Sequence, residues 1–131
     1  MKTLAQIRAA NALLHRQLVQ TALSQPGQGD ALSGFPMLIK IDGLLAALAF
    51  ATEQKRNQQG PDVRKHAADF AIASAIAAHL RHNQQDERIA ITGAQDPDDL
   101  VDELARGDSA LLRRAPAEAL AFLNYLKRFV A

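Results

Sequence analysis

The chain of 131 residues contains no cysteine. Disulfides and thiolate metal sites are therefore excluded, and this absence fits the reducing environment of the cytosol. Tryptophan is also absent, and the chain has only one tyrosine and five phenylalanines. Proteins that bind single-stranded nucleic acid stack its bases on aromatic side chains. Because this chain has few aromatic residues, we expect any contact with nucleic acid to depend on its sugar-phosphate backbone and its shape.

Long uninterrupted apolar segments are missing as well. The most apolar run, from Phe35 to Ala51, contains Lys40 and Asp42 and is shorter than a typical membrane span. The first residues lack the apolar core of a signal peptide. We therefore expect a cytoplasmic protein without membrane contact, in which this run forms a buried helix.

Motifs typical of catalysis are lacking too. None of the four serines stands in a nucleophile-elbow context, and Gly27 and Gly29 form no phosphate-binding loop because no strand precedes them. The carboxylates between Asp96 and Glu103 open a helix, where solvated acidic side chains complement the helix dipole. We expect neither enzymatic activity nor a cofactor.

The four histidines raise the question of a metal site. His79 and His82 are three residues apart, and Asp86 follows. No third strong ligand is fixed by local spacing, so we interpret these residues as a polar helix end and predict no metal. His15 and His66 have the positions of solvated helix residues.

What the sequence has in quantity is alanine and leucine, within an apolar content of 48%. Both are strong helix formers, whereas strands favour β-branched residues. We predict one all-α domain over residues 1–131, a compact bundle of about five helices with a central apolar helix. Residues Ile89–Thr92 have local strand character but no second strand to pair with.

Helix signals place the elements. Each segment is bounded by capping or turn residues. The first expected helix begins at Thr3, with a capping box to Gln6, and runs to about Leu23; its apolar stripe consists of Leu4, Ile7, Leu14 and Leu18. A loop from Ser24 to Gly34 follows, and then a central helix from about Pro36 to Arg56 and a further helix from about Asp62 to Arg81. A short helix capped by Asp96 should end near Arg106, and a last helix should begin between Asp108 and Pro116. We interpret Gly43, inside the central helix, as a close helix crossing rather than a break.

The C-terminal segment is the clearest amphipathic helix. Its apolar residues share one face at helical spacing, whereas Asn124, Lys127 and Arg128 lie toward the other face. The apolar residues are Ala119, Phe122, Leu123, Leu126 and Val130.

Charge is unevenly distributed along the chain. Residues 1–81 carry nine basic and five acidic side chains, residues 86–108 carry two and eight, and residues 109–131 carry four and one. We therefore expect an acidic patch and separate basic regions. From charge clustering, the candidates for contacts with nucleic-acid phosphates are Lys40, Lys55, Arg56, Arg64, Lys65, Arg113, Arg114, Lys127 and Arg128. We prefer the middle pairs, Lys55-Arg56 and Arg64-Lys65, because the helix dipole alone explains Lys127 and Arg128.

Two segments together resemble one known family. Pro36 to Phe50 is similar to its apolar P-x-x-I-x-x-N/D-G-L-x-x-A-L-A-F helix, and Glu118 to Phe129 to its E-A-L-x-F-L-x-W/Y-L-K-R-F helix. Ala5 to Ala10 is similar to its first helix. The chain thus resembles the small (fifth) subunit of the type III-B, Cmr-type CRISPR effector complex. It departs from the pattern at Asp42, where asparagine is common, and at Tyr125, where tryptophan is common.

This resemblance implies a non-catalytic, all-α subunit in RNA-guided antiviral defence. Several copies would stack into a short filament beside the backbone subunits, along the groove that holds the crRNA–target RNA duplex, and join the large polymerase-like subunit to the rest. The alternative is a helical adaptor that binds a protein and no nucleic acid, with the acidic segment Asp86–Asp108 as its working surface. An enzyme is a third option.

Overall fold

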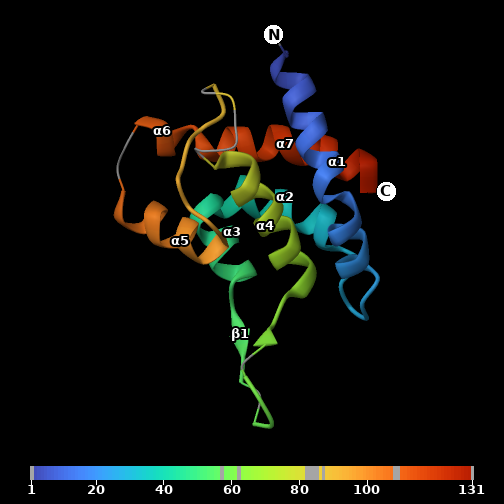
Figure 1. The fold of residues 1–131 in the computed structure, drawn as a ribbon. Helices are drawn as coiled ribbons and strands as arrows, with labels where there is room; N and C mark the ends of the chain where they lie inside the picture. Colours follow the sequence, from blue (N-terminus) through green and yellow to red (C-terminus); the bar gives the residue numbers. More distant parts are fainter. Residues whose placement is uncertain are drawn as a thin grey trace.

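The computed structural model describes residues 2–56, 58–61, 63–81, 86, 88–107 and 110–130, with the side chain of residue 111 excepted. Figure 1 shows a helical bundle from which a small hairpin projects. The elements are α1 (Leu4–Leu23), α2 (Ala31–Asp42), α3 (Leu44–Ala51), β1 (Gln54–Lys55), β2 (Val63–Arg64), α4 (Ala67–Leu80), α5 (Pro97–Arg106), α6 (Ala110–Arg113) and α7 (Ala115–Val130). The predicted helical class is confirmed, with more and shorter helices than the five expected.

The first and last helices, α1 and α7, pack against each other although they lie at opposite ends of the sequence (Figure 1). The amphipathic prediction for α7 is confirmed, because all five residues of its apolar face are buried while Lys127 and Arg128 are exposed. Thr3 and Gln6 form the predicted capping box at the start of α1.

The predicted apolar stripe of α1 faces the bundle only at its start, where Leu4 and Ile7 are partly buried. Leu14 and Leu18 are 76% and 69% exposed, whereas Ala12 and Val19 are fully buried. The α1 helix lies so close to α4 and α7 that small residues fill its inner face. The longer leucines therefore stand on its outer face.

The expected central helix from Pro36 to Arg56 is wrong in three respects. It begins earlier, at Ala31, so that Pro36 lies inside α2, and helix α3 ends at Ala51. It is also divided at Gly43, whose φ of 93° and ψ of 164° end α2 and begin α3. A Cβ added at Gly43 would meet nothing within 4 Å, so this glycine marks a break and not a close crossing.

The most central helix is α4 instead. Ile72, Ile76 and Leu80 are fully buried, and α4 contacts α1, α2, α3, α5 and α7. By contrast, α2 and α3 each bury one face and leave apolar side chains such as Met37 and Ile41 exposed. The centre of the bundle therefore lies in the alanine-rich third segment of the chain.

A two-stranded antiparallel hairpin replaces the helix ends that we expected around residues 56 and 62. Gln54 pairs with Arg64 and Lys55 with Val63, and the backbone N–H of Lys65 donates to the carbonyl of Glu53 at 2.9 Å. The helix expected to begin near 62 begins at Ala67. Two-residue strands carry no measurable periodicity, which is why the sequence pattern did not reveal them.

The α5 helix has the predicted bounds, and the side chain of Asp96 caps it by accepting from the N–H of Asp99 at 2.8 Å. Before it, Ile89 and Ile91 are buried, and Thr92 forms an isolated parallel bridge with Arg81. In the part of the chain that the structure describes, no helix is long and apolar enough to cross a membrane.

Candidate nucleic-acid interface

The hairpin gathers four of the nine candidate basic residues. Lys55 belongs to β1, Arg64 to β2, and Arg56 and Lys65 follow directly after these strands. The four lie on a hairpin and its flanks, not on helix ends as we expected. The side chains of Lys55, Arg56 and Lys65 are exposed, and the hairpin projects away from the bundle (Figure 1). We call Lys55, Arg56 and Lys65 the hairpin group.

Arg64 differs from its neighbours because it is engaged in structural contacts. Its guanidinium binds Asp98 at 2.7 Å, donates to the carbonyl of Thr52 at 2.9 Å, and lies 4.1 Å above the ring centroid of Phe70. These contacts anchor the hairpin to α4 and α5. Arg64 therefore has a structural role that competes with a role in binding phosphate.

A second group joins residues that are far apart in the sequence. Lys40 of α2 and Lys127 of α7 line the same hollow of about 130 Å³. Arg128 lines a neighbouring hollow of about 160 Å³, and Asn124 borders both. We call Lys40, Lys127 and Arg128 the α2–α7 group. Sequence spacing gave no sign of this association, because it depends on how two helices pack.

Arg113 and Arg114 form a third basic position. Arg113 lies in α6, and the guanidinium of Arg114 donates to the backbone carbonyl of Arg88. They precede α7, whereas Lys127 and Arg128 are near its end. At a rise of about 1.5 Å per residue, the two pairs are about 20 Å apart. The nine candidates thus form three separate groups and not one continuous surface.

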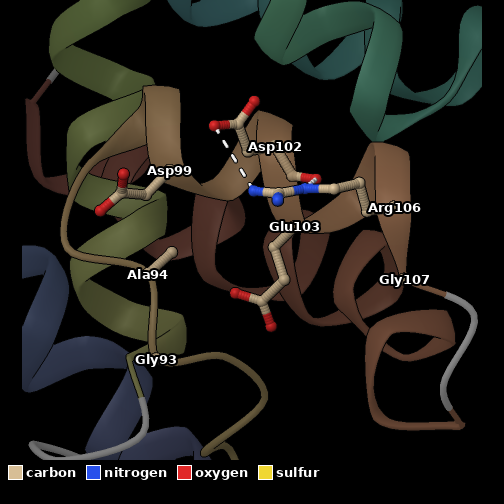
Figure 2. Close-up of a pocket in the computed structure, with 7 residues that line it drawn as sticks. All are labelled: Gly93, Ala94, Asp99, Asp102, Glu103, Arg106 and Gly107. Carbon is tan, nitrogen blue, oxygen red and sulfur yellow. Dashed lines mark hydrogen bonds and ion pairs between the residues drawn. The ribbon is translucent and has the colours of Figure 1, made fainter.

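The acidic segment forms a groove of about 510 Å³ along α5 (Figure 2). Asp99, Asp102 and Glu103 line it, together with Arg106. Arg106 pairs with Asp102 at 3.7 Å, and the hydroxyl of Thr92 donates to Glu103. The groove keeps net negative charge, since a single arginine accompanies three carboxylates.

A buried polar cluster lies between α1, α4 and α7. The carboxylate of Glu118 accepts two hydrogen bonds from the guanidinium of Arg8, both at 2.7 Å. It also contacts Nε2 of His79 at 3.0 Å, while Nδ1 of His79 is 2.9 Å from the side-chain amide of Asn11. The His79 ring is fully buried and stacks on Phe122 with 4.4 Å between centroids. His79 is therefore a core residue and not part of a polar helix end.

The charge on Glu118 is fixed by its partners. Burial raises the pKa of its carboxyl, but the hydrogen bonds from Arg8 and His79 outweigh this effect and hold the pKa at about 2. The sequence did contain a signal for this buried acid. Glu118 lies four residues before Phe122 and eight before Leu126, which places it on the apolar face of α7.

The remaining histidines differ from our expectations as well. His15 is half-buried, and burial lowers its pKa, with smaller effects from His79 and Arg81. His66 stacks on Phe50 and contacts Glu53 at 3.0 Å. His82 lies outside the described residues, so the proposed spacing with His79 is not described. Among the described residues, no group of three potential metal ligands occurs.

The fold and its surface define a class of protein: a small helical bundle that presents separate basic and acidic regions. The family model of the CRISPR-associated protein (Cas_Cmr5) matches residues 4–131, so the chain belongs to this family, that of the small subunit of type III-B Cmr effector complexes. No curated protein matches the chain.

Among solved structures, the chain is similar to a CRISPR-associated Cmr5 family protein from Thermus thermophilus. The two chains share 22% identity with a TM-score of 0.61, and the match covers 99% of this chain and 96% of the other. At this identity the likeness shows a shared fold. The family predicted from Pro36 to Phe50 and Glu118 to Phe129 is confirmed by the family model.

Proposed function

We propose that the chain acts as a non-catalytic, RNA-contacting small subunit of its effector complex. Several copies stack into a short filament along the groove that holds the crRNA–target RNA duplex, beside the backbone subunits and in contact with the large polymerase-like subunit. Family membership supports assembly into a Cmr complex. The arrangement of charge on the surface supports the two finer parts of the proposal.

The hairpin group is the observation that carries the RNA contact. Lys55, Arg56 and Lys65 are exposed on a projecting element, where flexible ammonium and guanidinium groups reach phosphates with little loss of internal contacts. Of the three, only Lys65 has an acidic neighbour among the described residues, and its distance to Glu53 is 4.0 Å. Exposed pairs of this kind contribute little to stability.

Stacking follows from the separation of opposite charges. The acidic groove of α5 and the α2–α7 group are different surfaces of one molecule. A contact between two unlike surfaces is heterologous, and it adds copies in one direction until a partner caps it. We assign the α2–α7 group to this contact, which leaves the hairpin group for RNA.

The RNA contact is tested with Lys55→Gln, Arg56→Gln and Lys65→Gln combined. Assembled complexes that carry this variant should hold target RNA less tightly. The magnitude of the slope of log affinity against log salt should decrease by about 2 to 3 for each copy that contacts RNA, because each of the three lost phosphate contacts removes about 0.7 to 0.9. Fluorescence anisotropy with labelled RNA at several salt concentrations measures both quantities.

The control neutralises Lys2 and Arg16, two exposed basic residues that lie outside the three basic groups and outside the acidic groove. This control should leave affinity and slope unchanged. If the hairpin variant retains the wild-type slope in complexes of normal composition, the hairpin group does not contact RNA.

A second candidate function is the protein adaptor without an RNA role. The acidic groove favours it, since carboxylates on α5 suit a basic protein surface. This candidate predicts that neutralising the hairpin group changes nothing, whereas Asp99→Asn with Asp102→Asn removes a protein partner from the complex.

A further inference from the structure

A second pocket, of about 410 Å³, lies between the starts of α2 and α4 and the end of α3. Its wall includes Leu38, Phe50 and the ring of His66. Asp30 and Asp69 line it as well. We call this feature the Asp69 pocket. It combines an apolar wall with two carboxylates.

The two carboxylates are not neutralised by a basic side chain. Within the described part of the chain, neither Asp30 nor Asp69 forms an ion pair or a side-chain hydrogen bond with a basic residue. His66 is the basic side chain in the wall, but its Nε2 binds Glu53 at 3.0 Å and its ring stacks on Phe50. Asp69 is half-buried, and burial raises the pKa of its carboxyl, while nearby His66 offsets only part of this effect. A cation bound at this position would offset the unfavourable free energy of burying a charged carboxylate.

The rim of the pocket is already fixed. The backbone N–H of Ala68 donates to the side-chain carbonyl of Gln28 at 3.0 Å, which ties the loop before α2 to the first turn of α4. The Phe50 and His66 rings stack face to face, with 3.8 Å between their centroids and 16° between their planes, so each ring holds the other in place. A ligand would therefore enter a largely preformed site, which lowers the ordering cost of binding.

We propose that the Asp69 pocket binds an arginine side chain presented by a protein partner. A guanidinium forms paired hydrogen bonds with a carboxylate and also stacks on aromatic rings, and its aliphatic stem packs on apolar surface. Asp69 and Asp30 supply the negative charge, while Leu38 and Phe50 supply the apolar contact. RNA is disfavoured here because its phosphates would approach two carboxylates that carry like charge. This binding mode is independent of the proposed RNA contact.

The test uses the peptide acetyl-Gly-Arg-Gly-amide as the probe and NMR of the ¹⁵N-labelled full chain as the measurement. Saturable shifts should appear at the amides of residues 27–35, 37–38 and 66–69, with a dissociation constant on the order of millimolar. The same peptide with citrulline, a neutral isostere of arginine, should bind at least about 10-fold more weakly. Equal shifts with both peptides would overturn the proposal.

Two substitutions, one that removes a charge and one that fills the pocket, test whether the peptide binds in the Asp69 pocket. Asp69→Asn should weaken the arginine peptide at least about 5-fold, whereas Asp102→Asn, the same change in the other groove, should not. Gly34→Leu should block the pocket without unfolding the chain, because a Cβ at position 34 meets nothing within 4 Å and leucine favours helix more than glycine. Wild-type binding by both Asp69→Asn and Gly34→Leu would refute the assignment. So would an oligouridine that shifts the same amides while the arginine peptide does not.

Discussion

At the scale of single residues, Glu118 is held by three helices. It is 7% exposed and receives charge-assisted hydrogen bonds from Arg8 of α1 while it contacts His79 of α4. With Nε2 of His79 donating to Glu118 and Nδ1 accepting from the side-chain amide of Asn11, both ring nitrogens have a hydrogen-bond partner. The buried carboxylate is therefore an anchor for packing, and its proximity to a histidine does not indicate catalysis.

Replacing Glu118 with glutamine should destabilise the protein by about 2 kcal/mol. The variant leaves the partly buried Arg8 guanidinium without its counter-charge, although an amide oxygen still accepts one hydrogen bond. Urea unfolding followed by circular dichroism measures the change. The matched control is Asp102→Asn, which removes an exposed pair at 3.7 Å and should cost under about 0.5 kcal/mol.

The pH dependence of the free energy of unfolding tests whether the charge of Glu118, and not only its shape, stabilises the protein. The pKa of Glu118 lies at about 2 in the folded protein and near its ordinary value of 4.5 after unfolding. The stabilisation is thus fully present above pH 4.5 and is lost as the pH falls toward 2. The stability difference between wild type and Glu118→Gln should narrow over this range. A difference that stays constant down to about pH 2.5 would contradict the role of charge.

At the scale of helices and strands, the helix starts with side-chain caps were predictable from the sequence, whereas the starts without such caps and the outward side of α1 were not. Thr3 and Asp96 are caps whose hydrogen bonds depend on neighbours within four residues, so α1 and α5 begin where expected. The outward position of Leu14 depends on the close approach of α1 to two other helices, which no local pattern encodes. The grouping of the basic residues also depends on helix packing, since Lys40 and Lys127 come together only because α2 packs against α7.

Gly43 offers a test of backbone conformation. Its φ of 93° with ψ of 164° lies in a region that is essentially restricted to glycine. Gly43→Ala should therefore lower the free energy of unfolding by about 1–3 kcal/mol. Gly34→Ala, in the interior of α2 with open space around its Cβ, should instead raise it by about 0.5–1 kcal/mol. Equal effects of the two substitutions in thermal unfolding would contradict this assignment.

At the scale of the whole molecule, the separation of charge predicts salt-dependent self-association. Asp99→Lys with Asp102→Lys should prevent stacking, and so should Lys127→Glu with Arg128→Glu, because each pair of changes removes one side of a heterologous contact. Mixing the two variants should restore association into stacks in which the variants alternate, because the new lysines of one variant face the new glutamates of the other and the two unchanged surfaces also remain complementary. Analytical ultracentrifugation at low salt distinguishes these species, and a mixture that stays monomeric would exclude this pairing of surfaces.

The pairing of α1 with α7 also bears on how the chain is made. Arg8 meets Glu118 across 110 positions of sequence, and α7 packs against α1. A growing polypeptide emerges from the ribosome with α1 first, so its inner face has no permanent cover until the final helix has left the exit tunnel. Contacts of such long range form late and slowly. Completion of the bundle should therefore wait until α7 has left the exit tunnel, and a nascent chain stopped before Glu118 should remain sensitive to proteases.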